Sequence, residues 1–161
     1  MQPSQSNLCY CGSQLSLADC CQPLLNGEKT ASSAEALMRS RFSAYASGNF
    51  PYILATYGPE QRIAHSLEEL AKDSQHTRWL KLDVHQSSQN GCNGQVEFSA
   101  YYQFDGQFYR MHESSQFVYQ DGQWYYTTGK VHKDSGAYQL QRNDHCLCGS
   151  GKKFKKCCGS K

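Results

Sequence analysis

Two groups of four cysteines stand near opposite ends of this 161-residue sequence. The first lies in CYCGSQLSLADCC and the second in CLCGSGKKFKKCC, and both fit the pattern C-x-C-G-S-x6-C-C. The cysteines are Cys9, Cys11, Cys20 and Cys21 in the first group and Cys146, Cys148, Cys157 and Cys158 in the second. Gly12 and Ser13 recur as Gly149 and Ser150, so the repeat is of a small folded unit and not of cysteines alone.

Clustered cysteines serve disulfides, redox chemistry or metal binding. The first residues, MQPSQSNLCYCG, contain neither the basic nor the apolar region of a signal peptide, so we expect a cytoplasmic protein. In that reducing compartment, cysteine clusters are more often metal sites than disulfides, and neighbours such as Cys20 and Cys21 are poorly placed to bridge each other. Four thiolates beside a tight Gly-Ser turn favour a closed tetrahedral site, so we predict two zinc ions, one per group.

Zinc binding is not the only chemistry that clustered cysteines serve. A thiol cluster for redox chemistry or copper handling is the competing interpretation, whereas iron–sulfur proteins typically use the spacings C-x2-C or C-x4-C, which neither group has. His145, next to Cys146, is a weaker candidate ligand. The ninth cysteine, Cys92 in NGCNG, is predicted to be an exposed turn residue.

Both ends of the chain resemble the SEC-C motif, the zinc-binding segment at the C-terminus of the SecA translocation ATPase. The N-terminal copy departs from it by having QLSLAD where the family has glycine and lysines. With ALMRSRFSAYASGN and HESSQFVYQDGQWYYTTG between these ends, nearly the whole chain resembles the bacterial YchJ family. That resemblance implies zinc motifs at 1–29 and 141–161, a nuclear-transport-factor-2-like (NTF2-like) domain at 30–140, and no established activity.

The middle segment changes its hydrophobic period along the chain, from that of helices to that of strands. A capping box at Ser32 and Glu35 predicts an amphipathic helix over 33–47, followed by helices over 50–57 and from Ser66 to about Ser74. Alternating residues then predict strands over 79–87 and 95–104, with hairpin turns at Asn90-Gly91, Asp105-Gly106 and Asp121-Gly122. This order predicts an α+β fold with N-terminal helices packed on an antiparallel sheet, and the resemblance implies that the sheet is curved into a cone.

Two charged residues fall on apolar faces. Arg41 lies on the apolar stripe of the first helix, and Glu113 shares a strand face with Met111 and Phe117. Burying an unpaired charge costs several kcal/mol, roughly, so we expect these two to meet or to share hydrogen bonds inside the cone.

The alternative interpretation is a functional pocket. Relatives of the NTF2-like fold enclose pockets that serve dehydratase or isomerase chemistry, so the resemblance implies Glu113 as a general base, with Arg41, Tyr45 or His112 orienting charge. An arginine would lower the pKa of that carboxylate, and the alternation places His112 on the opposite strand face. We therefore favour a binding protein over an enzyme, with small-molecule binding or a dehydratase- or isomerase-like activity in the central pocket as the alternative.

The two cysteine units differ in charge. Lys152, Lys153, Lys155 and Lys156 lie within the second unit, whereas the first contains Asp19 and no lysine. The basic unit suits a protein partner, the ribosome or RNA, and the likeness to SecA implies a chaperone or the ribosome. The competing interpretation is that the lysines only offset the charge of the thiolates. No run of about 18 apolar residues occurs, so we expect no membrane span.

Overall fold

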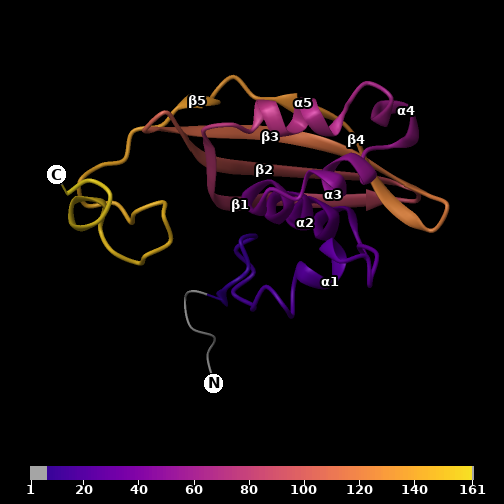
Figure 1. Cartoon of the computed structure of the whole chain (residues 1–161), viewed down its shortest axis with the longest axis horizontal. Helices are drawn as coiled ribbons and strands as arrows, with labels where there is room; N and C mark the ends of the chain where they lie inside the picture. Colours follow the sequence, from indigo (N-terminus) through magenta and orange to yellow (C-terminus); the bar gives the residue numbers. More distant parts are fainter. Residues whose placement is uncertain (1–6, 161) are drawn as a thin grey trace.

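Four long antiparallel strands form the centre of the protein in our computed structural model, which describes residues 7–160 (Figure 1). They are β1 (Thr77–Asn90), β2 (Asn93–Phe104), β3 (Gln107–Gln120) and β4 (Gln123–Val131). The strands pair in chain order, and a short β5 (Gly136–Ala137), which we did not expect, pairs with β3. The predicted α+β class, with helices on an antiparallel sheet, is confirmed.

Tight two-residue turns connect the strands. Asp105-Gly106 and Asp121-Gly122 have left-handed φ angles of 47° and 82°, and of 51° and 85°, as type I′ hairpins require. The first turn lies one residue later than expected: Asn90 pairs with Asn93, so the loop is Gly91-Cys92. Gly91 has φ 62°, and glycine at the first central position is the requirement of a type II′ turn.

The longest helix, α2 (Ala34–Ser47), begins at Ser33, whose hydroxyl accepts a hydrogen bond from the Ala36 amide at 3.0 Å. The expected capping box on Ser32 is therefore wrong by one residue. Glu35, its supposed partner, binds Arg39 and Ser87 instead. The helix ends at Gly48, which has φ 75°, as the sequence predicts.

Shorter helices complete the helical layer. α3 (Phe50–Ala55) and α5 (Leu67–Asp73) begin at the caps Asn49 and Ser66. Two further helices were not predicted: α1 (Gln22–Leu25) and α4 (Pro59–Arg62). Pro59 starts α4, because proline suits the first turn of a helix.

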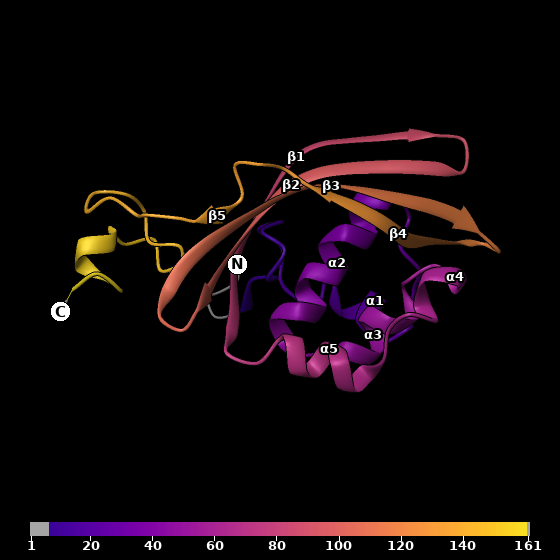
Figure 2. The same cartoon turned by 90° about the horizontal axis from the view of Figure 1, so that it is seen from above.

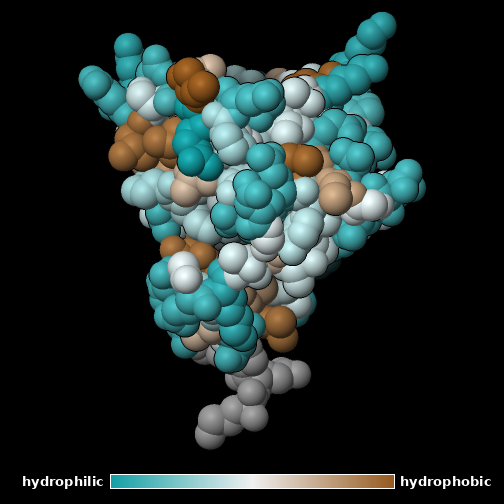
Figure 3. Space-filling view, turned by 90° about the vertical axis from the view of Figure 1, so that its right-hand side faces the viewer, coloured by the Kyte–Doolittle hydropathy of each residue, from teal (hydrophilic) through white to brown (hydrophobic). Residues whose placement is uncertain are grey.

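The helices cover one face of the curved sheet (Figure 2). The main core lies between α2 and this face, and includes Leu37 and Phe42 from the helix and Val96, Phe98 and Trp124 from the strands. None of the helices within 7–160 is long and apolar enough to cross a membrane. At the end of the molecule shown in Figure 3, hydrophobic residues occur as separate spots in a mostly hydrophilic surface, as is ordinary for proteins.

Candidate metal centres and the central cavity

The four N-terminal cysteines converge on one point. The sulfur atoms of Cys9, Cys11, Cys20 and Cys21 all lie within 4.8 Å of one another. The sulfur of Cys20 lies 3.5 Å from that of Cys11 and 3.9 Å from that of Cys21. Four sulfurs bound to one zinc ion at ~2.3 Å lie about 3.8 Å apart, so the quartet has the size of a closed tetrahedral site.

The four C-terminal cysteines form a second quartet of the same size. The sulfurs of Cys146, Cys148, Cys157 and Cys158 also lie within 4.8 Å of one another. Cys157 lies 3.3 Å from Cys148 and 4.0 Å from Cys158, measured between sulfurs. Each quartet can therefore hold one metal ion.

The backbone of the two units repeats as closely as the sequence does. The amide of Cys9 donates to the Leu15 carbonyl at 2.8 Å, and the amide of Cys146 donates to the Lys152 carbonyl at 2.9 Å. The hydroxyl of Ser13 donates to the Cys20 sulfur at 3.1 Å, and Ser150 lies 3.2 Å from Cys157 in the same way. In each unit the glycine of the Gly-Ser pair forms a left-handed turn, with φ 80° at Gly12 and 82° at Gly149. The serine places its hydroxyl beside one cysteine sulfur.

In each quartet the surroundings favour the thiolate form of one cysteine and disfavour it for another: burial raises the pKa of Cys20 to about 11, and a hydrogen bond with Cys146 raises the pKa of Cys158 to about 12. Hydrogen bonds from the thiols of Cys11 and Cys21 lower the pKa of Cys9 far below its usual value. Burial raises the pKa of Cys148, but hydrogen bonds from Ser150 and from the thiols of Cys157 and Cys146 outweigh it and bring the pKa to about 6. Because the thiolate is the form that binds metals, one sulfur per quartet is ready to bind near neutral pH.

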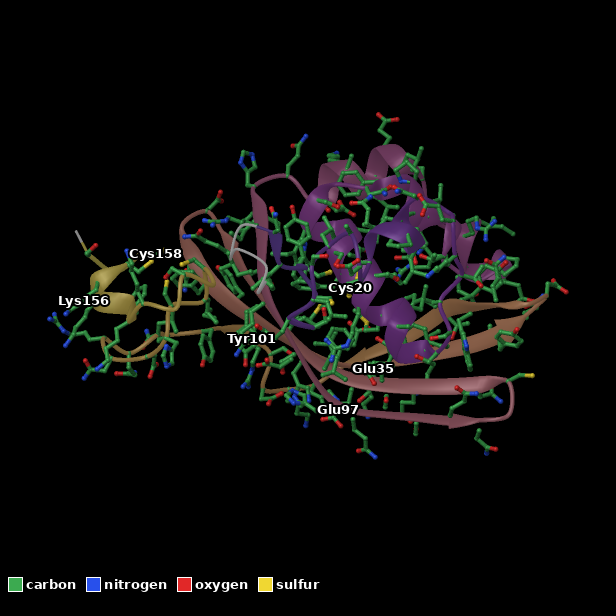
Figure 4. All side chains as sticks on the ribbon, turned by 90° about the horizontal axis from the view of Figure 1, so that it is seen from below. Cys20, Glu35, Glu97, Tyr101, Lys156 and Cys158 are labelled. Atoms are coloured by element: carbon green, nitrogen blue, oxygen red, sulfur yellow. The ribbon has the colours of Figure 1, made fainter. Side chains whose placement is uncertain are left out.

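The two quartets differ sharply in their attachment to the rest of the protein. Cys9, Cys11 and Cys21 are buried at 5%, 0% and 2% exposure. The Cys9 sulfur lies 3.5 Å from the hydroxyl of Ser43 in α2, and Arg39 of the same helix donates to the Cys11 carbonyl at 2.8 Å. In Figure 4, Cys20 accordingly lies close to the helices. The N-terminal unit is therefore part of the folded body.

The C-terminal unit lies beyond the end of the sheet, as the labels of Cys158 and Lys156 in Figure 4 show. Cys158 is exposed, and the unit contacts the sheet through an edge-to-face pair of Phe154 with Phe108, whose ring centres are 5.9 Å apart. Of the four lysines predicted to bind a partner, Lys152, Lys153 and Lys156 are exposed and Lys155 is half-buried. The lysines thus stand on a projecting part of the molecule.

A cavity of about 330 Å³ lies between the helices and the sheet. Its walls are mostly aromatic and apolar, and include Phe42, Tyr45, Trp79 and Met111. Arg41 and Glu113 also line it, so the structure brings together the two charged residues singled out from the sequence. Both are buried, at 3% and 8% exposure.

Arg41 and Glu113 share a neighbour instead of forming a direct ion pair. The Arg41 guanidinium donates to the Ile53 carbonyl at 2.9 Å and to the Thr56 hydroxyl. It lies over the rings of both Tyr57 and Tyr126, 4.6 Å and 4.7 Å from their centres. Among the described residues, no salt bridge joins this pair and no hydrogen-bond partner is common to both, so the expectation that they meet or share hydrogen bonds is wrong. What they share is the side chain of Tyr126.

Tyr126 joins the two charges. Its hydroxyl donates to Glu113 at 3.0 Å while its ring faces Arg41, and Ser115 donates to the same Glu113 oxygen at 2.8 Å. Burial, and then the Glu113 charge, raise the pKa of Tyr126 well above its usual value, so the phenol stays a donor. Gly129 leaves room for the carboxylate, because a Cβ there would lie 1.8 Å from Glu113 Oε1. Tyr126 lines the cavity from strand β4. No signal in the sequence indicated that its side chain would contact both Arg41 and Glu113.

The other two residues proposed for the pocket, Tyr45 and His112, lie on opposite sides of the sheet. Tyr45 lines the cavity with Arg41, whereas His112 lies on the other face of the sheet, as the alternation predicts. Cys92 is exposed in the first hairpin turn, as expected.

These features define the class of protein: an NTF2-like domain combined with a SEC-C motif. A family model described as "YchJ, middle NTF2-like domain" matches residues 33–129, and the SEC-C motif matches residues 142–160. The chain belongs to the YchJ-like UPF0225 family. A UPF0225 protein from Vibrio vulnificus (strain YJ016) is 38% identical over 164 residues, which cover 94% of this chain and 98% of that protein.

Two solved structures agree with this assignment. The solution structure of a SEC-C motif containing protein from Rhodopseudomonas palustris is 40% identical, with a TM-score of 0.74, and covers 78% of this chain and 98% of that one. The crystal structure of a SEC-C motif containing protein from Psychrobacter arcticus is 30% identical, with a TM-score of 0.67, and covers 95% and 94%.

Proposed function

We propose that the protein is an interaction module that binds two zinc ions and uses its two cysteine units differently. The N-terminal zinc fastens the chain to helix α2, and the C-terminal zinc holds a basic surface that recruits an anionic partner. The observation that supports this division is the placement of one repeated unit in two settings, one buried against Ser43 and Arg39 and one projecting beyond the sheet. We place the protein in the cytoplasm, because its ligands must remain reduced thiols.

The positive charge of the C-terminal unit is the basis for proposing its partner. Lys152, Lys153, Lys155 and Lys156 lie in one short segment, where their positive field attracts phosphate or carboxylate groups. RNA, including ribosomal RNA, is the partner class we favour, because lysines that neutralise phosphates release counterions. An acidic protein surface is the alternative, and the two differ in the probe that is captured.

Changing the four lysines together to Gln should weaken binding of a labelled single-stranded RNA at low salt, while zinc content and melting temperature stay nearly unchanged. Each phosphate contact that is lost should lower the slope of log affinity against log salt by about 0.7. Fluorescence anisotropy with RNA and with an acidic peptide, each over a range of salt concentrations, measures the effect.

A matched control changes four exposed lysines elsewhere, Lys29, Lys72, Lys130 and Lys133, to Gln. It alters the net charge equally but leaves the C-terminal unit intact, so it should retain most of the binding. Equal binding by the wild type and the C-terminal variant would overturn the recruiting role. Capture of the acidic peptide alone would replace RNA by protein as the partner.

The cavity supports a second candidate function, the binding of a small molecule. It combines an apolar, aromatic wall with one buried cation and one buried carboxylate, Arg41 and Glu113. Such a pocket suits a small ligand with an apolar body and a polar end. No chemical step follows from the contacts of Glu113, whose hydrogen-bonded oxygen already accepts from Ser115 and Tyr126.

Methyl NMR can test this second candidate directly. Met38 and Met111 both line the cavity, and the chain has three methionines in all. Aromatic carboxylates added to methyl-labelled protein should shift the signals of Met38 and Met111 together and saturably. Ala100→Leu, which extends a side chain at the cavity wall, should reduce the shifts. Unchanged methionine signals across a set of such acids would count against a ligand of this class.

A further inference from the structure

Three of the six histidines, far apart in the sequence, meet on the face of the sheet opposite the helices. The ring of His112, in β3, stacks on that of His132 with centres 3.9 Å apart, and lies edge-to-face with His85 at 5.4 Å. Glu97, on the neighbouring strand β2, lies on this same side in Figure 4.

Carboxylates surround the central ring. Nε2 of His112 lies 2.7 Å from Glu97 Oε1, and its Nδ1 lies 2.8 Å from Asp134 Oδ1. Asp134 is itself held by Arg110 at 2.9 Å. A ring nitrogen of His132 also lies within 4.8 Å of the Glu97 and His112 ligand atoms. All three of these residues are half-buried.

We propose that Glu97, His112 and His132 form a third metal site, for a divalent ion of the zinc, cobalt or nickel type. Two imidazoles and a carboxylate are ligands that these ions accept, and three protein ligands leave a coordination position open. This site is independent of the two cysteine quartets and of the partner proposed for them.

The surroundings of His112 match the outer partners of known metal sites. A histidine that binds a metal through one nitrogen usually donates its other N–H to a carboxylate, which fixes the ring orientation. Asp134 is in that position on Nδ1, which leaves Nε2 directed at Glu97. Arg110 fixes Asp134 in turn, so the chain has an ordered second layer around this ring.

The three histidines come from three backbone segments: strand β1, strand β3 and the segment after β4. A bulge between Val84 and Gln86 gives β1 an extra residue, His85, whose Nε2 lies 2.8 Å from the Ser99 hydroxyl. The segment after β4 is tied to β3, because the His132 amide donates to the His112 carbonyl at 2.8 Å. Bulges often serve to direct a side chain at a functional site.

Metal binding requires the His132 ring to leave its stack on His112, because an imidazole nitrogen binds a metal in the plane of its ring and the two ring planes are now nearly parallel, at 9°. Ligand atoms at ~2.0–2.1 Å from a tetrahedral ion lie about 3.4 Å apart, so Glu97 and His112 must separate slightly. Nε2 of His132 lies 2.8 Å from the Ser114 hydroxyl, a contact that is lost when this nitrogen binds the metal and kept when Nδ1 does. A polar groove of about 240 Å³, lined by Gln86, Ser88, Gln95 and Glu97, adjoins the site at Glu97.

The experiment uses the full chain with both cysteine quartets loaded with zinc. Titration with Co²⁺ should show a third equivalent whose absorption lacks the thiolate-to-cobalt charge-transfer band, because its ligands are nitrogen and oxygen. Cobalt should also broaden the NMR signals of the His112 and His132 rings. Elemental analysis after gel filtration in excess Zn²⁺ gives an independent count.

Variants separate this site from general histidine binding. His112→Gln with His132→Gln should lose the third equivalent, whereas His65→Gln with His76→Asn, at exposed histidines elsewhere, should keep it. Asp134→Asn should weaken the third site by about 10- to 100-fold, as for other outer partners. Glu97→Gln, at a side chain that is 33% exposed, should weaken it at least as much and tests the site if the double variant fails to fold.

Two results would overturn the proposal. The wild type could take up only two equivalents, in which case protons and not a metal hold the Glu97–His112–Asp134 cluster together. Alternatively, the third equivalent could persist in both the double histidine variant and Glu97→Gln.

Discussion

Cys11→Ser should destabilise the middle domain by more than about 3 kcal/mol, whereas the matching change Cys148→Ser should leave its stability nearly unchanged. Structural zinc contributes its binding free energy to folding, and removing one thiolate weakens that contribution. Cys11 is fully buried in a unit that binds α2 through Ser43 and Arg39, so its loss is transmitted to the core. Cys148 belongs to the projecting unit.

Urea unfolding followed by tryptophan fluorescence measures this difference. Both tryptophans, Trp79 and Trp124, lie in the middle domain, and Trp124 is buried in the main core. They therefore report the domain and not the cysteine units. Metal analysis of each variant should show that a single zinc ion remains. Equal loss of stability in the two variants would contradict the fastening role assigned to the N-terminal unit alone.

Arg41→Ala should cost about 2–5 kcal/mol of stability, because it truncates a buried side chain that bonds the Ile53 carbonyl and the Thr56 hydroxyl and supplies the positive charge near Glu113. It also removes the cation from over the rings of Tyr57 and Tyr126 and leaves a void beside the cavity. Arg41→Met keeps much of the volume and should cost less. Thermal and urea unfolding of the same set of variants measure these costs.

A double-mutant cycle tests whether Tyr126 transmits the coupling. Arg41→Met and Glu113→Gln together should cost less than the sum of the single changes, even though the two side chains do not form an ion pair. Tyr126→Phe, which removes the hydroxyl bonded to Glu113, should reduce that difference. Strict additivity in the background with Tyr126 intact would show that the two charges are energetically independent.

The sequence by itself determined those parts of the protein whose signals are local. Each cysteine quartet lies within one short segment, so the spacing alone predicted that the sulfurs converge, and the repeat predicted the same turn twice. The Asp-Gly pairs at 105–106 and 121–122 predicted two hairpins, because their backbone requires left-handed φ angles. The helix start could not be assigned to one residue, since Ser32 and Ser33 offer the same chemistry, and in the structure Ser33 is the cap.

Only the tertiary structure decided how these parts meet. The two cysteine units are alike in sequence, but burial against α2 or projection beyond the sheet depends on contacts with distant residues such as Ser43 and Phe108. Likewise, Arg41 and Glu113 are joined by Tyr126, which the periodicity could not reveal. His85, His112 and His132 are scattered in the sequence and meet because a bulge, a strand register and the segment after β4 bring them together. Local patterns specify which face a residue takes, whereas its partners depend on register and packing across the whole sheet.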